Sequence, residues 1–249
     1  MQDKGLYIQL YSIHGLIRSR DLELGRDADT GGQTKYVVEL GTALSQDPRV
    51  GKVELIKRQI KDKTVSSDYS QPVETINDKF KIVRIRCGGG KYIRKELLWP
   101  YLDEFIDRSI NYIKSVGRLP DVFHSHYADA GYVCDELAGF FGIPSIHTGH
   151  SLGKVKLKKL LDDGMGMEDI EKRYKIEHRI NVEQEIINNF DLIITSTKQE
   201  IQEQYGEYKN VNAEKFKVIP PGVNLEKFYS YNDKEQANSE YDMRKRSYV

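Results

Sequence analysis

Short apolar segments rich in β-branched residues alternate with longer segments of helical periodicity along most of this chain of 249 residues. The predicted strands are 6–12, 52–58, 81–86, 121–127, 143–151, 191–196 and 216–223, the fifth and seventh running into loops. The predicted helices are 33–46, 95–117 with an interruption at Pro100, 129–142, 167–190 and 197–206. Such alternation predicts the α/β fold class, with a Rossmann-like parallel sheet covered by helices on both faces.

Two stretches lack this periodicity. Residues 61–79 are rich in turn-forming residues and are predicted to be a loop. Residues 229–249 are polar and are predicted to be a tail, so residues 1–228 are assigned to one domain. Since parallel sheets bind ligands at the carboxyl ends of their strands, the loops after Ser12, Tyr127, Thr148 and Ser196 are expected to line a site.

Charge and cysteine content exclude several classes of function. The chain has 38 lysines and arginines against 38 aspartates and glutamates, so no basic field favours nucleic acid or an anionic membrane. Cys87 and Cys134 show neither metal-ligand nor redox spacing. The first residues lack the pattern of a signal peptide, and no apolar run is long enough to span a bilayer, so we expect a cytoplasmic protein without a cofactor.

The segment Thr30-Gly31-Gly32-Gln33-Thr34 lies between an irregular loop and a predicted helix. Free amides and the helix dipole at such a junction favour a phosphate or another oxygen-rich ligand. An ordinary glycine turn, with Thr34 near the cap, explains the same residues, and spacing alone slightly favours it. The neighbouring "CGGGKYI" segment (87–93) lacks the ending of a P-loop.

Histidines cluster near two predicted strand ends, in "DVFHSHYADAG" and "HTGHSLGK". His124 and His126 have no clear third ligand, so we predict no metal site. They either pack on one face of a strand or, with Tyr127 and Asp129, belong to a sugar-binding edge. His147 and His150 flank the next strand end.

Basic residues follow this second histidine pair. Lys154 and Lys156 belong to a run of lysines that is either a solvated face or part of a phosphate site. Further along, Lys172, Arg179 and Glu183 are predicted to share one face of the long helix 167–190. From spacing alone, Arg179 and Glu183 form an exposed i,i+4 pair. The residues by themselves indicate an α/β domain with a plausible phosphorylated, hydroxyl-rich ligand.

The same segments carry a resemblance that covers residues 7–228. The blocks are "IHGLIRSRDLELGRDADTGGQTKYVVELGTAL", "GGGKYIRKELLWPYLDEFID", "SHYADAGYV", "TGHSLGKVKLKKLLDDGM", "YKIEHRINVEQE" and "VIPPGVNLEKF". In this order they closely resemble the sucrose-phosphate synthases, which are retaining glycosyltransferases related to sucrose synthase. The resemblance implies the N-terminal, acceptor-binding half of a GT-B fold.

The activity that the resemblance implies is glucose transfer from UDP-glucose to fructose 6-phosphate, which gives sucrose 6-phosphate and UDP. In such enzymes the departing phosphate is thought to deprotonate the acceptor hydroxyl, so the protein acts by positioning and by stabilising charge. The resemblance also implies a second Rossmann-like domain that holds most of the nucleotide sugar, on another chain or beyond this sequence. A non-catalytic sugar-phosphate-binding module and a related synthase that uses GDP-mannose remain alternatives.

The resemblance assigns roles to individual residues. His150 resembles the catalytic histidine that contacts the transferred glucosyl unit, and Gly31 and Gly32 resemble donor-binding residues. The residues that resemble acceptor-binding positions are Gly32, Gln33, Lys95, Tyr127, Ser151, Lys156 and Arg179. Of these, Lys156 and Arg179 resemble the pair that holds the 6-phosphate. His178 and Lys154 stand where the family often has arginine, which could weaken phosphate binding.

Overall fold

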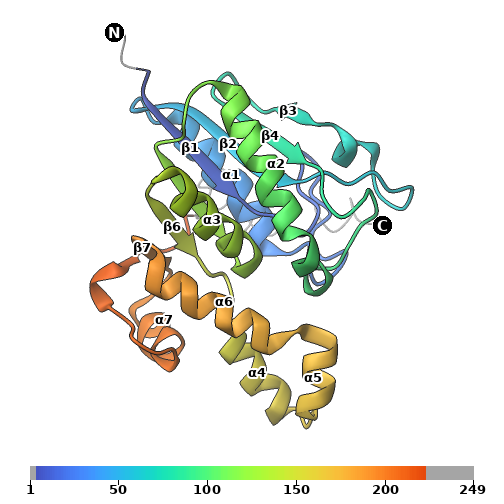
Figure 1. Cartoon of the computed structure of the whole chain (residues 1–249), viewed down its shortest axis with the longest axis vertical. Helices are drawn as coiled ribbons and strands as arrows, with labels where there is room; N and C mark the ends of the chain where they lie inside the picture. Colours follow the sequence, from blue (N-terminus) through green and yellow to red (C-terminus); the bar gives the residue numbers. More distant parts are fainter. Residues whose placement is uncertain (1–3, 223–249) are drawn as a thin grey trace, which may run out of the picture. The chain divides into compact units, whose positions relative to one another are not determined.

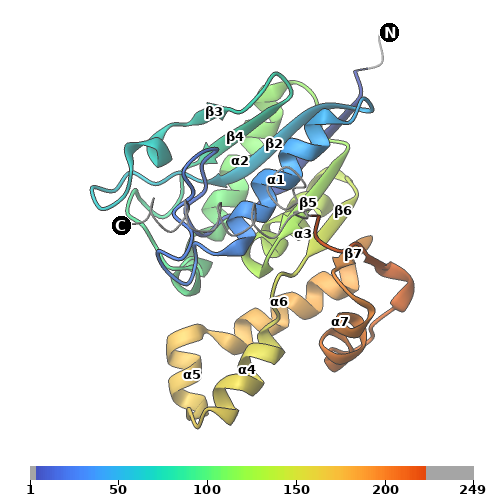
Figure 2. The same ribbon diagram turned by 180° about the vertical axis from the view of Figure 1, so that it is seen from behind.

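The computed structural model describes residues 4–222, and one mostly parallel sheet runs through them (Figures 1 and 2). The strands are β1 (Leu6–Tyr11), β2 (Val50–Arg58), β3 (Val73–Thr75), β4 (Phe80–Ile85), β5 (Val122–His126), β6 (Ser145–Thr148), β7 (Leu192–Thr195) and β8 (Phe216–Val218). Their order in the sheet is β3-β4-β2-β1-β5-β6-β7-β8. The chain leaves β1 in opposite directions for β2 and β5, so the topological switch point lies at β1 and β5.

Helices cover both faces of this sheet. They are α1 (Gly32–Gln46), α2 (Leu102–Val116), α3 (Ala128–Phe141), α4 (Gly153–Asp162), α5 (Met167–Tyr174), α6 (Ile176–Asn189) and α7 (Lys198–Glu203). Helix α1 covers the face seen in Figure 2, and α2 and α3 cover the face seen in Figure 1. The α/β sheet predicted from the sequence is therefore confirmed.

Alternate residues of the central strands pack into two separate hydrophobic cores, one on each face of the sheet. Ile8 and Leu10 of β1 pack with Val37 of α1 on one face. Tyr11 of β1 packs with Phe105 of α2 on the other face, in a core that also takes in α3 and α6. Strands that bury both faces in this way require a helix layer on each side, which fixes where the loops at the strand ends gather.

The long helix predicted over 167–190 is wrong in one respect, because it is two helices. Lys175 lies between α5 and α6 in the left-handed region with φ of 51°, and its amide donates to the carbonyl of Glu171. This is the geometry of a helix end, which a lysine adopts less readily than a glycine. Lys172 and Arg179 consequently belong to different helices and do not share a face.

The predicted loop 61–79 also contains structure. Val73–Thr75 forms β3, which pairs with β4 and is antiparallel to it. Such a short edge strand gives too few alternating residues to be recognised in a sequence. The interruption predicted at Pro100 is confirmed: Lys95–Leu97 and Trp99–Tyr101 are 3₁₀ turns, and α2 begins only at Leu102.

Two compact units divide the chain, Met1–Ile219 and Pro220–Val249. The predicted domain end at Phe228 and the predicted polar tail 229–249 lie outside the described residues. Within residues 4–222, no helix combines the length and the hydropathy that crossing a membrane requires.

Candidate active site at the carboxyl ends of β1, β5 and β6

The N-terminus of α1 lies at the switch point of the sheet. Among the described residues no side chain caps this helix, and Thr34 Oγ1 donates to the Gly31 carbonyl instead of accepting from an amide. A Cβ atom on Gly31 or Gly32 would meet nothing within 4 Å, so the space in front of the helix is open. Its first amides are thus available to an oxygen-rich ligand, which an ordinary capped turn would not allow.

Gln33 connects this helix end to the neighbouring strands. Its Nε2 donates to Ser12 Oγ at 3.1 Å, just after β1, and to the His126 carbonyl at 3.3 Å, at the end of β5. The side chain of Gln33 therefore has a defined place beside the loops that follow Ser12 and Tyr127.

Histidines that the sequence placed at two strand ends form one buried group. His126 Nδ1 lies 3.0 Å from His150 Nε2, and His124 Nε2 lies 2.9 Å from Thr148 Oγ1. Ser125 Oγ lies 2.7 Å from His147 Nδ1 on the adjacent strand. The packing interpretation of His124 and His126 thus holds for both rings, while His150, half-buried after β6, is the member that reaches the site edge.

Burial keeps these imidazoles neutral. Burial, and then the neighbouring His150, lowers the pKa of His124 to about 3. Burial and the adjacent His124 and His150 lower the pKa of His147 to about 3. Burial, and then His14, lowers the pKa of His150 to about 4, and the pKa of His126 is held well below 6.5 by burial and the surrounding histidines. At neutral pH His150 is therefore a neutral donor or acceptor.

A pocket beside this group brings together four predicted acceptor-binding residues that are far apart in the sequence. We call it the acceptor pocket, and its lining residues are Lys95, Glu96, Trp99, Tyr127, Asp129, Lys156, Tyr174 and Arg179. The 3₁₀ turn at 95–97, the α3 start, α4 and α6 each contribute. Tyr127 lies at the N-cap of α3 with φ of 79°, an uncommon conformation for a residue with a side chain, and His150 has φ of 58°.

Carboxylates hold the two lysines of the acceptor pocket. Lys95 pairs with Asp29, and its Nζ lies 3.7 Å from Glu96 Oε1. Lys156 Nζ lies 3.5 Å from the same oxygen and 3.9 Å from the centre of the Tyr174 ring. Burial alone would raise the pKa of Glu96, but Lys95, its own backbone amide and Lys156 hold that pKa below its usual value. Glu96 is therefore an ionised side chain between two cations.

Arg179 is built into the pocket wall. Its side chain is 4% exposed, and its Nε donates to Glu183 Oε1 at 2.9 Å. Its Nη2 donates to the carbonyl and the hydroxyl of Ser151, at 2.7 and 3.1 Å. The guanidinium also lies 4.4 Å from the centre of the Tyr127 ring. The prediction of an exposed Arg179–Glu183 pair is thus wrong, because tertiary packing buries both side chains.

Other members of the lysine run point elsewhere. Lys154 Nζ donates to the Glu207 carbonyl and lies over the Tyr208 ring, and Lys158 is exposed. Only Lys156 of the run lines the acceptor pocket, and the loop after Ser196 does not contribute to it.

Three acceptor-pocket contributors were missed by sequence reasoning. Glu96 directly follows Lys95, and a 3₁₀ turn carries both side chains to the same place. Trp99 and Tyr174 gave no polar signal, and the contact between Asp29 and Lys95 joins residues 66 positions apart. Glu96 could have been predicted because it directly follows Lys95, whereas no local pattern identifies Trp99, Tyr174 or the contact with Asp29.

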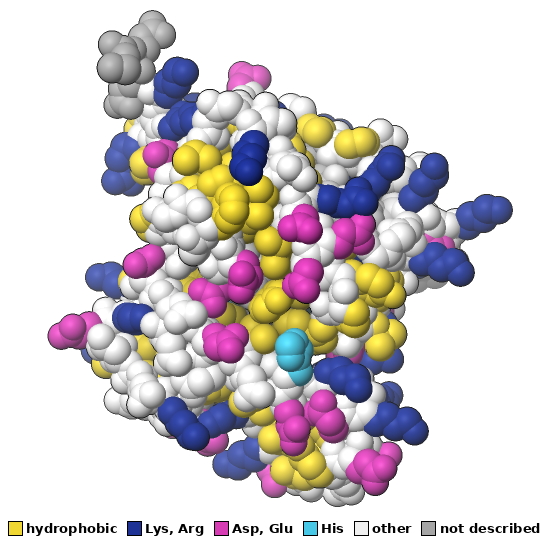
Figure 3. Space-filling view, viewed as in Figure 1, with side chains coloured by type: hydrophobic (Ala, Val, Ile, Leu, Met, Phe, Trp, Pro, Cys, Tyr) yellow, Lys and Arg dark blue, Asp and Glu magenta, His cyan; other side chains and the backbone are white. Residues whose placement is uncertain are grey.

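An apolar groove adjoins the acceptor pocket and shares Glu96 and Trp99 with it. Its other lining residues are Ile93, Leu97, Pro100, Tyr101, Asp103, Tyr132, Lys175 and His178. Figure 3 shows apolar side chains gathered on this side of the molecule with carboxylates around them. His178 packs edge-on against Trp99 with ring centres 4.5 Å apart, so it supports Trp99 from outside the acceptor pocket. Among the described residues, no group of three or more His, Cys, Asp or Glu side chains is arranged so that it could hold a metal ion.

The family model described as Glycosyltransferase Family 4 matches residues 30–227. The chain belongs to this glycosyltransferase family. It is 45% identical to sucrose-phosphate synthase from Zea mays over 88% of this chain and 23% of that protein. It is 44% identical to sucrose-phosphate synthase 4 from Arabidopsis thaliana, over 82% of this chain and 22% of that protein. The chain therefore spans less than a quarter of the length of these relatives.

Solved structures agree with this assignment. Sucrose-phosphate synthase from Thermosynechococcus elongatus superposes with a TM-score of 0.72 at 28% identity, over 94% of this chain and 52% of that chain. The catalytic domain of starch synthase IV from Arabidopsis thaliana superposes with a TM-score of 0.57 at 15% identity, over 92% of this chain and 54% of that chain, which shows a common fold. The resemblance to sucrose-phosphate synthases seen in the sequence is confirmed, and the chain corresponds to the N-terminal half of a GT-B glycosyltransferase.

Proposed function

We propose that this chain is the acceptor half of a glucosyltransferase that transfers glucose from UDP-glucose to fructose 6-phosphate and produces sucrose 6-phosphate and UDP. The observation that carries the proposal is the acceptor pocket, in which Lys95, Tyr127, Lys156 and Arg179 meet. Two buried or half-buried cations, Lys156 and Arg179, with carboxylates beside them suit a ligand that has a phosphate at one end and hydroxyls along its length.

In this proposal Lys156 and Arg179 hold the 6-phosphate. Ser151 and Tyr127 border the same space, since Arg179 bonds to Ser151 and stacks near Tyr127. Lys95 and Gln33 would contact the acceptor hydroxyls. Because Arg179 is fixed by Glu183 and Ser151 before any ligand arrives, little side-chain freedom is lost on binding.

The reacting edge is proposed to lie between His150 and the N-terminus of α1. Gly31 and Gly32 leave room for the diphosphate of the donor near the free amides, which would stabilise negative charge on the departing phosphate. The neutral His150 imidazole would hydrogen-bond to the glucosyl unit. Most contacts with UDP-glucose are expected from a second domain or a separate donor-binding chain.

Calorimetry with fructose 6-phosphate and with fructose tests the acceptor assignment. We expect the phosphorylated sugar to bind more tightly, and Lys156→Ala to weaken its binding about tenfold or more while fructose binding changes little, since hydrogen bonds between charged groups contribute roughly 1.5–3 kcal/mol. Lys158→Ala, an exposed lysine on the same helix, is the matched control. Equal losses of affinity for both sugars would refute the assignment of Lys156 to the 6-phosphate.

Release of UDP from UDP-glucose by this chain, with and without fructose 6-phosphate, tests the transfer itself. Acceptor-dependent release would support a catalytic chain. Binding of fructose 6-phosphate without UDP release would favour the alternative of a non-catalytic sugar-phosphate-binding module.

A further inference from the structure

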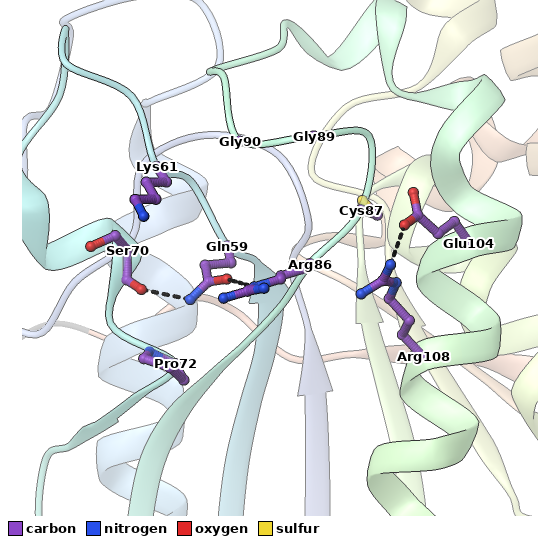
Figure 4. Close-up of a pocket in the computed structure, with 10 residues that line it drawn as sticks. All are labelled: Gln59, Lys61, Ser70, Pro72, Arg86, Cys87, Gly89, Gly90, Glu104 and Arg108. Carbon is purple, nitrogen blue, oxygen red and sulfur yellow. Dashed lines mark hydrogen bonds and ion pairs between the residues drawn. The ribbon is translucent and has the colours of Figure 1, made fainter.

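A second pocket lies at the carboxyl ends of β2 and β4, and it shares no lining residue with the acceptor pocket. We call it the glycine-loop pocket (Figure 4), and its lining residues are Gln59, Lys61, Ser70, Pro72, Arg86, Cys87, Gly89, Gly90, Glu104 and Arg108. Its volume is about 560 Å³, the size of a site for a small metabolite. The proposed transfer reaction assigns no role to it.

Hydrogen bonds from Arg58 hold residues 87–91, the glycine loop, in place. This buried arginine donates to the carbonyls of Cys87, Gly88, Gly89 and Lys91, at distances from 2.8 to 3.4 Å. The remaining carbonyl of the loop, that of Gly90, accepts from the amide of Lys61 at 2.7 Å. All five consecutive carbonyls are thus occupied by protein donors.

The amides of the same loop are less engaged. The Gly88 amide donates to Glu104 Oε2 at 2.8 Å. Across residues 4–222, the amides of Gly89 and Gly90 have no protein acceptor. Gly88 and Gly89 both have positive φ angles, and free backbone amides in a turn of this kind can donate to an anion.

The side chains that line the pocket include three positively charged groups, Lys61, Arg86 and Arg108, and one carboxylate, Glu104. Arg86 is held by a buried side chain, since its Nε donates to Gln59 Oε1 at 2.9 Å and Gln59 Nε2 donates in turn to the Ser70 carbonyl. The two terminal nitrogens of the Arg86 guanidinium thus remain free to donate side by side to a ligand. Arg108 Nη2 lies 2.8 Å from Glu104 Oε1, and Figure 4 shows this pair on the opposite side of the pocket from Lys61. The chain as a whole is neutral, so this excess of positive charge is local.

We propose that the glycine-loop pocket binds the phosphate group of a small, non-aromatic phosphorylated metabolite. The oriented fork of Arg86, the second arginine and the free amides match a tetrahedral dianion. No aromatic side chain lines the pocket within the described part of the chain, so nothing offers a stacking surface to a nucleobase.

Backbone amide NMR shifts during titration with inorganic phosphate and with glycerol 3-phosphate, at constant ionic strength, test this proposal. We expect saturable shifts at Gly88, Gly89 and Gly90. Arg86→Gln and Arg108→Gln should each weaken this binding about tenfold, because each removes a charge-assisted contact. Arg86→Lys should fall between, since it keeps the charge and loses the fork.

Lys114→Gln is the matched control, because it removes one positive charge from α2 outside the pocket. It should leave the shifts of the three glycines unchanged. Lys156→Ala should likewise leave them unchanged while it weakens the binding that produces shifts at the acceptor pocket, so failure of this proposal and failure of the acceptor assignment are distinguished. Absence of saturable shifts at the three glycines, an equal loss with Lys114→Gln, or equally tight binding of malonate would each overturn the proposal.

Discussion

The acceptor pocket and the glycine-loop pocket lie at the same edge of one sheet, yet they hold their charges in different ways. Arg179 in the acceptor pocket is 4% exposed and bonded to a buried carboxylate, whereas Arg108 of the glycine-loop pocket pairs with Glu104 in water at half exposure. The arginine of the acceptor pocket is therefore buried in the folded core, whereas that of the glycine-loop pocket lies at the surface. Ligand binding and stability should therefore be coupled in the first pocket and separable in the second.

Backbone strain divides the two pockets in the same way. The positive φ angles around the glycine-loop pocket belong to glycines, at Gly88 and Gly89. Near the acceptor pocket, three residues with side chains also have positive φ angles: Tyr127, His150 and Lys175. Residues other than glycine hold this conformation only where surrounding contacts enforce it, so the acceptor side is the more constrained of the two.

The largest difference should appear in acid, because the buried histidines lie on the acceptor side. Their pKa values, about 3 for His124 and His147 and about 4 for His150, lie below the ordinary value of 6.5. As pH falls below 6.5 the unfolded chain takes up protons that the folded chain does not bind, so stability falls from pH 6.5 towards pH 4. At pH 5 we expect a loss on the order of 5 kcal/mol relative to pH 7 for the whole group.

Urea unfolding at several pH values between 5 and 6.5, above the range where most carboxylates titrate, measures this loss. His124→Gln can keep the bond to Thr148 and removes one titrating group. It should reduce the slope of stability against pH by about 1 kcal/mol per pH unit, averaged over this range. A slope that His124→Gln leaves unchanged would mean that His124 is not buried in its neutral form.

The next effect compares the two arginines directly. Arg179→Met leaves Glu183 buried without its cation, so we expect a loss of roughly 3–5 kcal/mol in the free energy of unfolding. Arg108→Gln acts at an exposed pair and should change that free energy by less than about 0.5 kcal/mol. Urea unfolding of both variants at neutral pH measures the difference.

A second substitution separates the charge from the packing of Arg179. Glu183 Oε2 accepts from the Gly153 amide at 2.7 Å and also from the Tyr208 hydroxyl. Glu183→Gln added to Arg179→Met removes the stranded charge and can keep an acceptor for Gly153, so it should restore part of the lost stability. If the double variant is less stable than Arg179→Met alone, the stranded charge is not the cause.

A smaller effect concerns the carboxylates that share each pocket with its cations. Glu96→Gln removes the partner of Lys156, and Glu104→Gln removes the partner of Arg108. Each should tighten binding of inorganic phosphate in its own pocket, by about threefold to tenfold for the buried Glu96 and about twofold for the exposed Glu104. NMR titration of both variants follows the two pockets separately, and a larger gain at Glu104 would reverse the proposed contrast.

The residues of the two pockets could be predicted from the sequence to different degrees. The strands and helices around them were predictable, because alternating and helical periodicities are local properties. Lys95, Tyr127, Lys156 and Arg179 came from a resemblance, and spacing alone placed Arg179 on an exposed face. The partners that hold them could not be predicted, since Asp29 reaches Lys95 across 66 residues of sequence. The "CGGGKYI" segment lacks the ending of a P-loop, and the contacts of its carbonyls with Arg58 and Lys61 join residues that are distant in the sequence.

The helix break at Lys175 was also outside the reach of periodicity. Apolar positions continue through 167–190, but the turn at Lys175 sends α5 away from α6, and so Tyr174 and Arg179 face the acceptor pocket from two helices. No local signal such as glycine or proline marks this position.

This break provides the smallest of the expected effects. Glycine adopts the left-handed conformation at a helix end without the crowding that a Cβ atom creates, so Lys175→Gly should raise the free energy of unfolding by about 0.5–1 kcal/mol. Lys175→Ala is the matched control: it removes the same side chain, retains Cβ and should not stabilise the protein. If both variants had the same stability in urea unfolding, the conformation at Lys175 would carry no strain. The contrast with the glycine-bearing loop of the second pocket would then rest on burial alone.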